Sequence, residues 1–274
     1  MIKTSAIADH YGSAGMAENV LAALSREGID VDALSWDQLV AIDQFHTRGL
    51  PATREQAILA APEKGDAIVD FGCGVGGPAR FLAAEYGSNV TGIDLTPEYV
   101  ELAEILSARC GMADQVGFEL ADVLDVPFAD NTFDIGWSQN VSMNIADKTA
   151  FYAEVQRVLR SGGRFVTSDV ILGAGGETRW PLPWARDPSI SFVETGGEVR
   201  SAMEAAGFRI LDWRDTTADA VSAFQNFNQQ ARRGKLGVGL IAGADFAERS
   251  VNLAQGLAAG AFSSILVLAE RIED

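Results

Sequence analysis

The sequence predicts an α/β fold in which a mostly parallel sheet carries helices on both faces. Two observations lead to this prediction: seven short apolar runs have the length of strands, and segments with helical spacing separate most of them. Strands that alternate with helices are typical of parallel sheets covered on both faces. The final pair of strands suggests a Rossmann-like sheet with an added edge strand. Ligands of such sheets bind at the carboxyl ends of the strands.

The predicted elements divide the chain into two parts. Residues 1–53 are expected to form an N-terminal helical cap, and residues 54–274 a Rossmann-like domain with a lid insertion around 173–195. The predicted strands are Ala67–Phe71, Asn89–Asp94, Val116–Ala121, Phe133–Ser138, Arg164–Ile171, Phe208–Asp215 and Ser264–Arg271. The predicted helices lie near 54–61, 78–86, 97–111, 148–159, 196–206, 218–232 and 245–259. The last of these is amphipathic, which indicates a packing surface or, alternatively, an oligomer contact.

The composition narrows the classes of function. The chain has 274 residues, with 21 Lys and Arg against 38 Asp and Glu, and a formal net charge of −17. This surplus of acid argues against nucleic-acid binding and against docking on anionic membranes, because both need a basic face. Two cysteines make no disulfide framework, and two histidines without a cysteine cluster argue against a transition-metal site. Without a membrane-length apolar run or a signal-like start, we expect a soluble, cytoplasmic protein.

A glycine-rich loop follows the first predicted strand. Asp70, Gly72, Gly74 and Gly76 fit the pattern D-x-G-x-G-x-G, and Gly72, Gly74 and Gly77 also fit the dinucleotide pattern G-x-G-x-x-G. A dinucleotide places a pyrophosphate on the helix N-terminus, where an acidic neighbour is unfavourable. S-adenosylmethionine has no phosphate and carries an ammonium and a sulfonium, which the Asp70 carboxylate favours. The loop therefore favours S-adenosylmethionine over a nicotinamide dinucleotide.

Two further carboxylates follow the next two strands. Asp94 ends the second strand, 18 residues beyond Gly76, near the spacing of about 20 expected of an acid that holds a ribose diol. Asp122 ends the third strand, where a carboxylate can accept a hydrogen bond from an adenine amino group. The alternatives are a helix cap for Asp94, a role that Thr96 can also fill, and a solvated loop acid for Asp122.

In this order, these residues resemble the class I S-adenosylmethionine-dependent methyltransferases. The resemblance covers about residues 40–272 and includes segment 127–134, before the fourth predicted strand, and segment 159–164, before the fifth. It implies the seven-stranded fold of that family, with S-adenosylmethionine as the cofactor and S-adenosylhomocysteine as the product.

The resemblance also implies roles for single residues. Asp70 and the glycines would line the methionine part of the cofactor, Asp94 would hold the ribose hydroxyls, and Asp122 with Val123 would contact the adenine. The full set of cofactor-binding residues implied in this way is Asp70, Gly72, Gly74, Gly76, Asp94, Leu95, Asp122, Val123, Ser138 and Gln139.

The N-terminal stretch 43–49, with Ala52 and Thr53, points to a narrower group within the family. It resembles the sarcosine/dimethylglycine N-methyltransferase-like (methyltransferase type 11) group. The resemblance implies a small-molecule acceptor, favouring an amine nitrogen as in sarcosine or dimethylglycine. The alternative is an O- or C-methyltransferase acting on a small aromatic or secondary metabolite. Other functions left open are a nicotinamide-dependent oxidoreductase and a non-catalytic S-adenosylmethionine sensor, and self-association into a homo-oligomer is a further expectation.

The candidate catalytic residues are His46, Tyr11 and Asn144. His46 is interpreted either as a base or as a hydrogen-bonding residue that fixes the N-terminal segment. Asn144 stands where related amine methyltransferases often carry a histidine, and an asparagine is no general base near neutral pH. A base is not obligatory, because a sulfonium is a good leaving group and methyl transfer mostly needs alignment.

Aromatic faces and carboxylates are suited to a cationic amine. The substrate-binding candidates are Trp180, Trp184 and Glu194 in the predicted lid, with ordinary packing as the alternative for the two tryptophans. An acceptor that carries a carboxylate should meet an arginine. The candidates for that contact are Arg48, Arg179 and Arg186.

Overall fold

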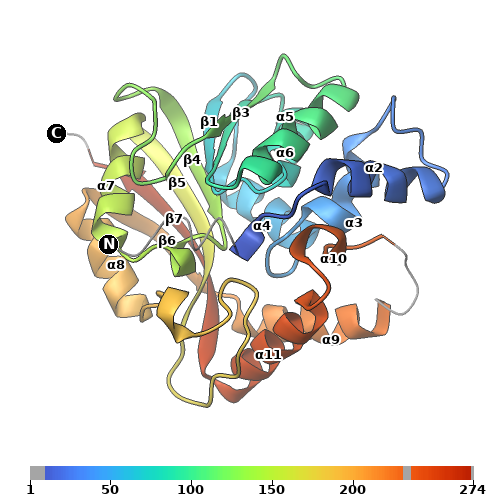
Figure 1. Ribbon diagram of the computed structural model, residues 1–274. Coiled ribbons are helices and arrows are strands. Elements are labelled where there is room, and N and C mark those ends of the chain that lie inside the picture. The colour runs from blue at the N-terminus through green and yellow to red at the C-terminus, as the bar shows by residue number, and fades with distance from the viewer. Residues whose placement is uncertain (1–9, 231–235, 273–274) are drawn as a thin grey trace.

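A seven-stranded sheet organises the chain (Figure 1). The computed structural model describes residues 10–230 and 236–272. Its strand order is β3-β2-β1-β4-β5-β7-β6, with β1 to β5 paired in parallel. The strands are β1 (Ala67–Phe71), β2 (Asn89–Asp94), β3 (Val116–Leu120), β4 (Phe133–Gln139), β5 (Leu159–Leu172), β6 (Phe208–Asp215) and β7 (Phe262–Arg271). The predicted α/β class is confirmed.

The sequence suggested that the added strand lies at the edge of the sheet. In the structure, the antiparallel strand β7 lies inside the sheet, between β5 and β6. β7 runs antiparallel to β5 on one side and to β6 on the other, so that Glu270 is opposite both Arg164 and Arg209. Burial explains the placement, because an interior strand is covered on both faces: most residues of β7 are buried, whereas β6 is more exposed. β5 begins at Leu159, earlier than the predicted Arg164.

Helices cover both faces of the sheet (Figure 1). The α-helices are α2 (Met16–Arg26), α3 (Val40–Asp43), α4 (Leu50–Ala60), α5 (Gly77–Tyr86), α6 (Pro97–Arg109), α7 (Lys148–Val158), α8 (Gly196–Ala205), α9 (Thr217–Gln230), α10 (Gly239–Ala242) and α11 (Phe246–Ala259). The 3-10 turns are η1 (Trp36–Leu39), η2 (Ser142–Asn144) and η3 (Pro188–Ile190). Pro51 lies in the first turn of α4, where a missing N–H costs nothing. Within the described ranges, no helix combines the length and apolarity needed to cross a membrane.

The core is divided by the sheet. Neighbouring residues of one strand enter different apolar clusters: Val69 and Phe165 belong to one, Ile68 and Val166 to the other. This is the result expected when successive side chains of a strand point to opposite faces. A third cluster packs α2 against α6, and a fourth lies between the loop after β5 and α11.

A buried ion pair fixes the N-terminal helices against the glycine loop. Arg80 of α5 donates to the Asp43 carboxylate of α3 at 3.0 Å and to the backbone carbonyl of Val75 at 2.7 Å. A Cβ on Gly77 would lie 2.2 Å from the carbonyl oxygen of Asp43, so the two segments touch through their backbones. The chain before β1 therefore forms one wall of the space at the carboxyl ends of the strands.

Two other segments close the same space. His10 Nε2 lies 3.1 Å from the carbonyl oxygen of Pro183, in the loop after β5, and 3.2 Å from the guanidinium of Arg249 on α11. Figure 1 shows α10 and α11 beside the start of the described chain. The N-terminal segment, the loop after β5 and the last helices thus meet over the strand ends.

Candidate active site

A cavity of about 770 Å³ opens at the carboxyl ends of the strands, and its lining has two parts. We call the first the glycine-loop side; it comes from the ends of β1 to β3 and the start of α6, and includes Asp70, Gly72, Gly74, Asp94, Leu95, Thr96, Tyr99, Asp122, Val123 and Leu124. We call the second the apolar side; it comes from the other segments, and its large apolar members include Phe45, Val141, Met143, Trp184, Phe192, Phe224, Val238, Phe246 and Leu253.

The glycine loop is open toward the cavity at Gly74. Gly72 and Gly74 have φ values of 69° and 55°, in the left-handed region that glycine adopts without strain. A Cβ on Gly74 would meet no atom within 4 Å, whereas a Cβ on Gly72 would lie 2.5 Å from Val141. Gly74 is therefore the position where a ligand can approach the backbone closely, while Gly72 is needed for packing.

Asp70 is a buried carboxyl group with an unused oxygen. Its relative exposure is 2%, and its Oδ2 has no hydrogen-bond partner among the described residues. Burial, with a contribution from the nearby Asp94, raises the pKa of Asp70 well above its usual range. Because an unpaired buried acceptor is costly, this oxygen is suited to a cationic or hydrogen-bond-donating group of a ligand.

Asp94 and Asp122 hold the backbone of the surrounding loops. Asp94 accepts from the N–H of Gly74 and from the N–H of Thr96, both at 2.9 Å, and Asp122 accepts from the N–H of Leu124 at 3.0 Å. Burial raises the pKa of Asp94 although these N–H donors oppose the shift. Each carboxylate oxygen can accept more than one hydrogen bond, so both acids can still bind hydroxyl or amino groups. The part of the chain that the structure describes holds no group of three His, Cys, Asp or Glu suited to a metal ion.

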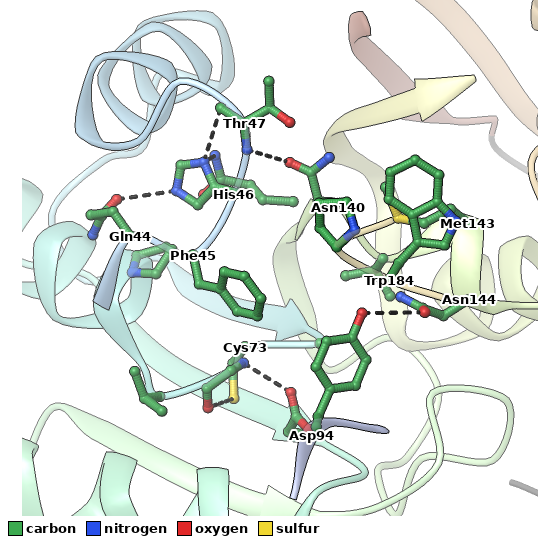
Figure 2. Close-up of a pocket in the computed structure, with 18 of the residues that line it drawn as sticks. Gln44, Phe45, His46, Thr47, Cys73, Asp94, Asn140, Met143, Asn144 and Trp184 are labelled. Atoms are coloured by element: carbon green, nitrogen blue, oxygen red, sulfur yellow. Dashed lines mark hydrogen bonds between the residues drawn. The ribbon is translucent and has the colours of Figure 1, made fainter. Parts of the chain in front are cut away.

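His46 lies among hydroxyl and amide groups, of which Figure 2 shows those of Gln44 and Thr47. Its Nε2 lies 3.0 Å from Thr53 Oγ1 and 3.2 Å from Gln44 Oε1, and its Nδ1 lies 3.3 Å from the carbonyl oxygen of Thr47. Burial lowers the pKa of His46 to about 4, so the imidazole is neutral at pH 7. These contacts fix the segment from Gln44 to Thr47, and the neutral ring is in the protonation state that a base requires.

Tyr11 and Asn144 join the N-terminal segment to η2. The Tyr11 hydroxyl donates to Asn144 Oδ1 at 3.3 Å. Burial raises the pKa of Tyr11 above its usual value, so the hydroxyl keeps its proton. Asn140, just before η2, has a φ of 57° and accepts from the backbone N–H of Thr47 at 2.9 Å. A left-handed asparagine at such a place is the local strain often found in functional sites.

Two charged side chains that sequence reasoning missed hold η2 from opposite sides. The Asp169 carboxylate accepts from the N–H groups of Val141 and Ser142 at 3.0 and 3.1 Å. The Lys148 ammonium donates to the carbonyl oxygens of Ser142 and Ile145 at 2.9 Å, and to that of Phe192 in the loop after β5 at 2.6 Å. Both residues are buried. They fix the position of Met143 and Asn144 in the cavity wall.

Of the three predicted substrate-binding residues, one lines the cavity and two do not. Trp184 lines the cavity, while its Nε1 donates to Ser191 at 2.9 Å and its ring meets Phe262 edge-on at 5.5 Å. Trp180 packs against the apolar cluster under the loop after β5, and Glu194 lines a separate depression near α8. Trp184 therefore both packs and faces the cavity, whereas Trp180 and Glu194 lie outside its lining.

The structure brings most of the predicted site residues together. Those that line the cavity are Tyr11, His46, Asp70, Gly72, Gly74, Asp94, Leu95, Asp122, Val123, Gln139, Asn144 and Trp184. Two predicted cofactor-binding residues lie behind the lining. Ser138 is fully buried, and Gly76 faces inward, since a Cβ there would lie 2.6 Å from Phe118.

The last helices contribute a wall that the sequence did not predict. Phe246, Ser250 and Leu253 lie on one face of α11, at the helical spacing of four and three residues, and all three line the cavity. The amphipathic pattern of this helix was visible in the sequence. Apolar residues at helical spacing have the same sequence pattern whether they pack on a core or face a ligand. The sequence therefore did not predict that this face of α11 lines the cavity.

Comparison with known proteins identifies a domain within the chain. Residues 69–167 match the family model described as a methyltransferase domain. A probable chloroplastic tocopherol O-methyltransferase of Oryza sativa subsp. japonica is 40% identical over 106 residues, which are 39% of this chain and 29% of that protein.

Two solved structures show how far the likeness of fold extends. Geranyl diphosphate C-methyltransferase from Streptomyces coelicolor A3(2) is 19% identical, with a TM-score of 0.72 over 99% of both chains. A putative sarcosine dimethylglycine methyltransferase from Galdieria sulphuraria is 19% identical, with a TM-score of 0.65 over 81% of this chain and 84% of that one. The likeness confirms the predicted fold. The chain spans between 28% and 59% of the length of four curated relatives that it matches.

Proposed function

Because this chain carries a class I methyltransferase domain, we propose that it transfers a methyl group from S-adenosylmethionine to a small-molecule acceptor. The observation that carries the proposal is the buried Asp70, which lines the same cavity as the open backbone of Gly74 and whose Oδ2 has no hydrogen-bond partner among the described residues. The oxygen fits an ammonium, and the glycine leaves room for a ligand. The same carboxyl is unfavourable for a pyrophosphate, so the proposal is favoured over a nicotinamide-dependent oxidoreductase.

The residues of the glycine-loop side fit the other parts of this cofactor. Asp94 and Asp122 keep acceptor capacity for the ribose hydroxyls and the adenine amino group, since each carboxylate oxygen can accept more than one hydrogen bond. Leu95 and Val123 follow these acids and supply apolar contact in the lining. Gln139 is placed at the end of β4, between the two sides.

When bound, S-adenosylmethionine supplies a methyl group on sulfur: the sulfur–carbon bond breaks, its electron pair stays on sulfur, and an acceptor lone pair forms the new bond. The protein then has to align the acceptor, which is the larger part of catalysis with so good a leaving group. Tyr11 and Asn144 are placed to orient the acceptor. The His46 imidazole is neutral, but its pKa of about 4 makes it a weak base, so it takes a proton only from a strongly acidic group such as the oxonium formed when a hydroxyl is methylated.

The acceptor is the finer part of the proposal. The sequence favours an amine such as sarcosine or dimethylglycine, with an oxygen or carbon acceptor as the alternative. The carboxylate of an amino acid needs a free cation, but of the three arginines predicted for it only Arg48 lines the cavity, and each of the three already donates to another side chain. The pairs are Arg48 with Glu55 at 2.5 Å, Arg186 with Asp245 at 2.9 Å and Arg179 with Gln255 at 2.9 Å. The geometry supports the alternative better.

Calorimetric titration with S-adenosylmethionine tests the proposal. We expect saturable binding that Asp70→Asn weakens by about 10-fold or more, because the amide no longer pairs with the ammonium. Asp114→Asn, at an exposed position after α6, is the matched control and should bind like the unaltered protein. Binding of NADH in place of S-adenosylmethionine, or equal affinity in the Asp70 variant, would contradict the assignment.

A further inference from the structure

The apolar side of the cavity is built from aromatic and aliphatic side chains of four separate segments. Phe45 comes from the N-terminal segment, Met143 from η2, Trp184 from the loop after β5, and Phe246 and Leu253 from α11. Figure 2 shows Phe45 extending from the N-terminal segment toward the middle of the drawn site, with Met143, Trp184 and Asn144 across from it. The rings of Phe45 and Phe246 meet edge-on at 5.3 Å. Such a wall favours an apolar ligand, because binding removes both surfaces from water.

An anionic ligand finds no free cation in this wall. Arg48 is the one arginine or lysine in the described lining. Its guanidinium lies 2.5 Å from the Glu55 carboxylate and 4.0 Å from that of Asp219. Arg249, just behind the lining, is paired with Asp245 at 2.9 Å. Burying a carboxylate or a phosphate here would leave it without a counter-charge, which is costly.

A cationic ligand finds one carboxylate on the apolar side that no cation of the described residues neutralises, Asp147, and that residue is exposed to solvent, where its charge is screened. Of the acids in the described lining, only Asp43 and Asp147 lie off the glycine-loop side. Asp43 is paired with Arg80 at 3.0 Å, and Asp147 caps α7 by accepting a backbone N–H at 2.9 Å. The Phe246 ring already faces a cation, since the Arg249 guanidinium carbon lies 5.8 Å from its centroid. That ring is thus a poor host for a second cation.

Neutral polar groups are what the apolar side offers instead. Ser250, on the cavity face of α11, is 5% exposed, and its hydroxyl has no partner among the described residues. Asn144 makes one hydrogen bond through its oxygen, to the Tyr11 hydroxyl, which leaves its amide N–H groups for a ligand. A buried hydroxyl without a partner is costly unless a ligand supplies one.

We propose, building on the proposed function, that the acceptor is an uncharged and largely apolar molecule. Its carbon skeleton lies against Phe45 and α11, and neutral hydroxyl or carbonyl groups bind Asn144 and Ser250. For an acceptor hydroxyl, an oxygen lone pair forms the bond to the methyl carbon, the sulfur–carbon pair stays on sulfur, and the hydroxyl proton passes to His46 or to water. This class excludes dimethylglycine, which carries a carboxylate, and phosphorylated amines.

A series of ligands of different charge, three of which carry the same octyl chain, tests this inference. The full-length protein is first saturated with S-adenosylhomocysteine, and that titration alone decides whether the cofactor assignment holds. The saturated protein is then titrated with 4-octylphenol, octyl phosphate, octylamine and dimethylglycine. We expect the neutral phenol to bind at least about 10-fold more tightly than each charged compound. Equal or tighter binding of any charged compound, or no binding of the phenol, would overturn the inference.

Two variants locate the binding surface. Phe246→Ala should weaken 4-octylphenol binding by about 10-fold, because a large apolar contact is lost. Ser250→Ala removes only a hydroxyl and is the variant that keeps the wall packed; we expect it to weaken the phenol by about threefold or more. Val251→Ala, on the exposed face of α11, is the control. Affinity for S-adenosylhomocysteine should stay within twofold in all three. Phenol binding unchanged in both wall variants would contradict the placement.

Discussion

The two sides of the cavity are built in opposite ways. On the glycine-loop side, three carboxylates and a glycine backbone lie at the ends of β1, β2 and β3, and two of the acids accept hydrogen bonds from backbone N–H groups of the loops after these strands. The apolar side is assembled from segments as far apart in the chain as Tyr11 and Leu253. Its uncharged polar groups include Asn144 and Ser250, whereas Arg48 is paired with Glu55, Asp43 is paired with Arg80 and Asp147 caps α7.

The difference shows how one fold can keep the same cofactor site while the site for the acceptor changes. A strand end fixes the direction of the residue that follows it, so the glycine-loop side depends on a few positions in parallel strands. A wall made of a loop, a helix face and an N-terminal segment depends on tertiary packing and tolerates other side chains. We therefore expect that substitutions on one side of the cavity leave binding of the ligand on the other side unchanged.

The largest effect is expected from Asp94→Ala. The substitution removes the acceptor of the Gly74 and Thr96 N–H groups together with the one proposed for the ribose hydroxyls, so affinity for S-adenosylhomocysteine should fall by about 100-fold. Calorimetry measures the loss, and a thermal melt shows whether the fold is kept. Unchanged affinity for S-adenosylhomocysteine would show that Asp94, at the end of β2, does not bind the ribose hydroxyls.

The next largest effect is the pH dependence that His46, on the N-terminal segment, gives to the free energy of unfolding. The pKa of His46 is about 4 in the folded protein and about 6.5 when unfolded, so the unfolded state binds more protons between these pH values. His46 therefore destabilises the fold as the pH falls from 6.5 to 4, by up to about 3 kcal/mol. His46→Gln should flatten the pH dependence of the unfolding free energy in this window, as urea titrations would show. An unchanged slope would contradict the buried, neutral histidine.

Lys148→Met tests the apolar side of the cavity. The ammonium donates to three carbonyl oxygens that position η2 and Phe192, and its loss should raise KM for the acceptor about 10-fold by misplacing the wall. Affinity for S-adenosylhomocysteine should change by less than about twofold. Lys64→Met, at an exposed position, is the control. A larger loss of cofactor affinity than of acceptor affinity would show that the two sides are not separate.

The smallest effect is expected from Trp184→Phe. Phenylalanine keeps most of the packing on Phe262 but loses the hydrogen bond to Ser191 and part of the surface that faces the cavity. We expect KM for the acceptor to rise about threefold with little change in kcat. If only the melting temperature falls, Trp184 serves packing alone.

The fold and the glycine-loop side were largely predictable, because their signals are local. The strand ends carrying Asp70, Asp94 and Asp122 are where the sequence placed them. The position of β7 was not predictable in this way, since an antiparallel strand can add at the edge or pair inside the sheet with the same residue pattern. Self-association and a cytoplasmic location stay predictions.

The apolar side was predicted only in part, because its members meet through tertiary structure. The sequence singled out Tyr11, His46, Asn144 and Trp184, which do line the cavity. It missed Lys148, since a buried lysine that donates to carbonyl oxygens looks like any helix lysine in a sequence. The face of α11 was interpreted as packing for the same reason, as its spacing describes a stripe and not what the stripe contacts.

The fate of a labelled methyl group shows which class of acceptor the protein methylates. The protein is incubated with methyl-deuterated S-adenosylmethionine and a mixture of neutral apolar phenols and enols, dimethylglycine and phosphoethanolamine, and the products are read by mass spectrometry. We expect label in the neutral apolar compounds and none in the charged ones. Label in dimethylglycine or phosphoethanolamine, with the neutral compounds unlabelled, would contradict it.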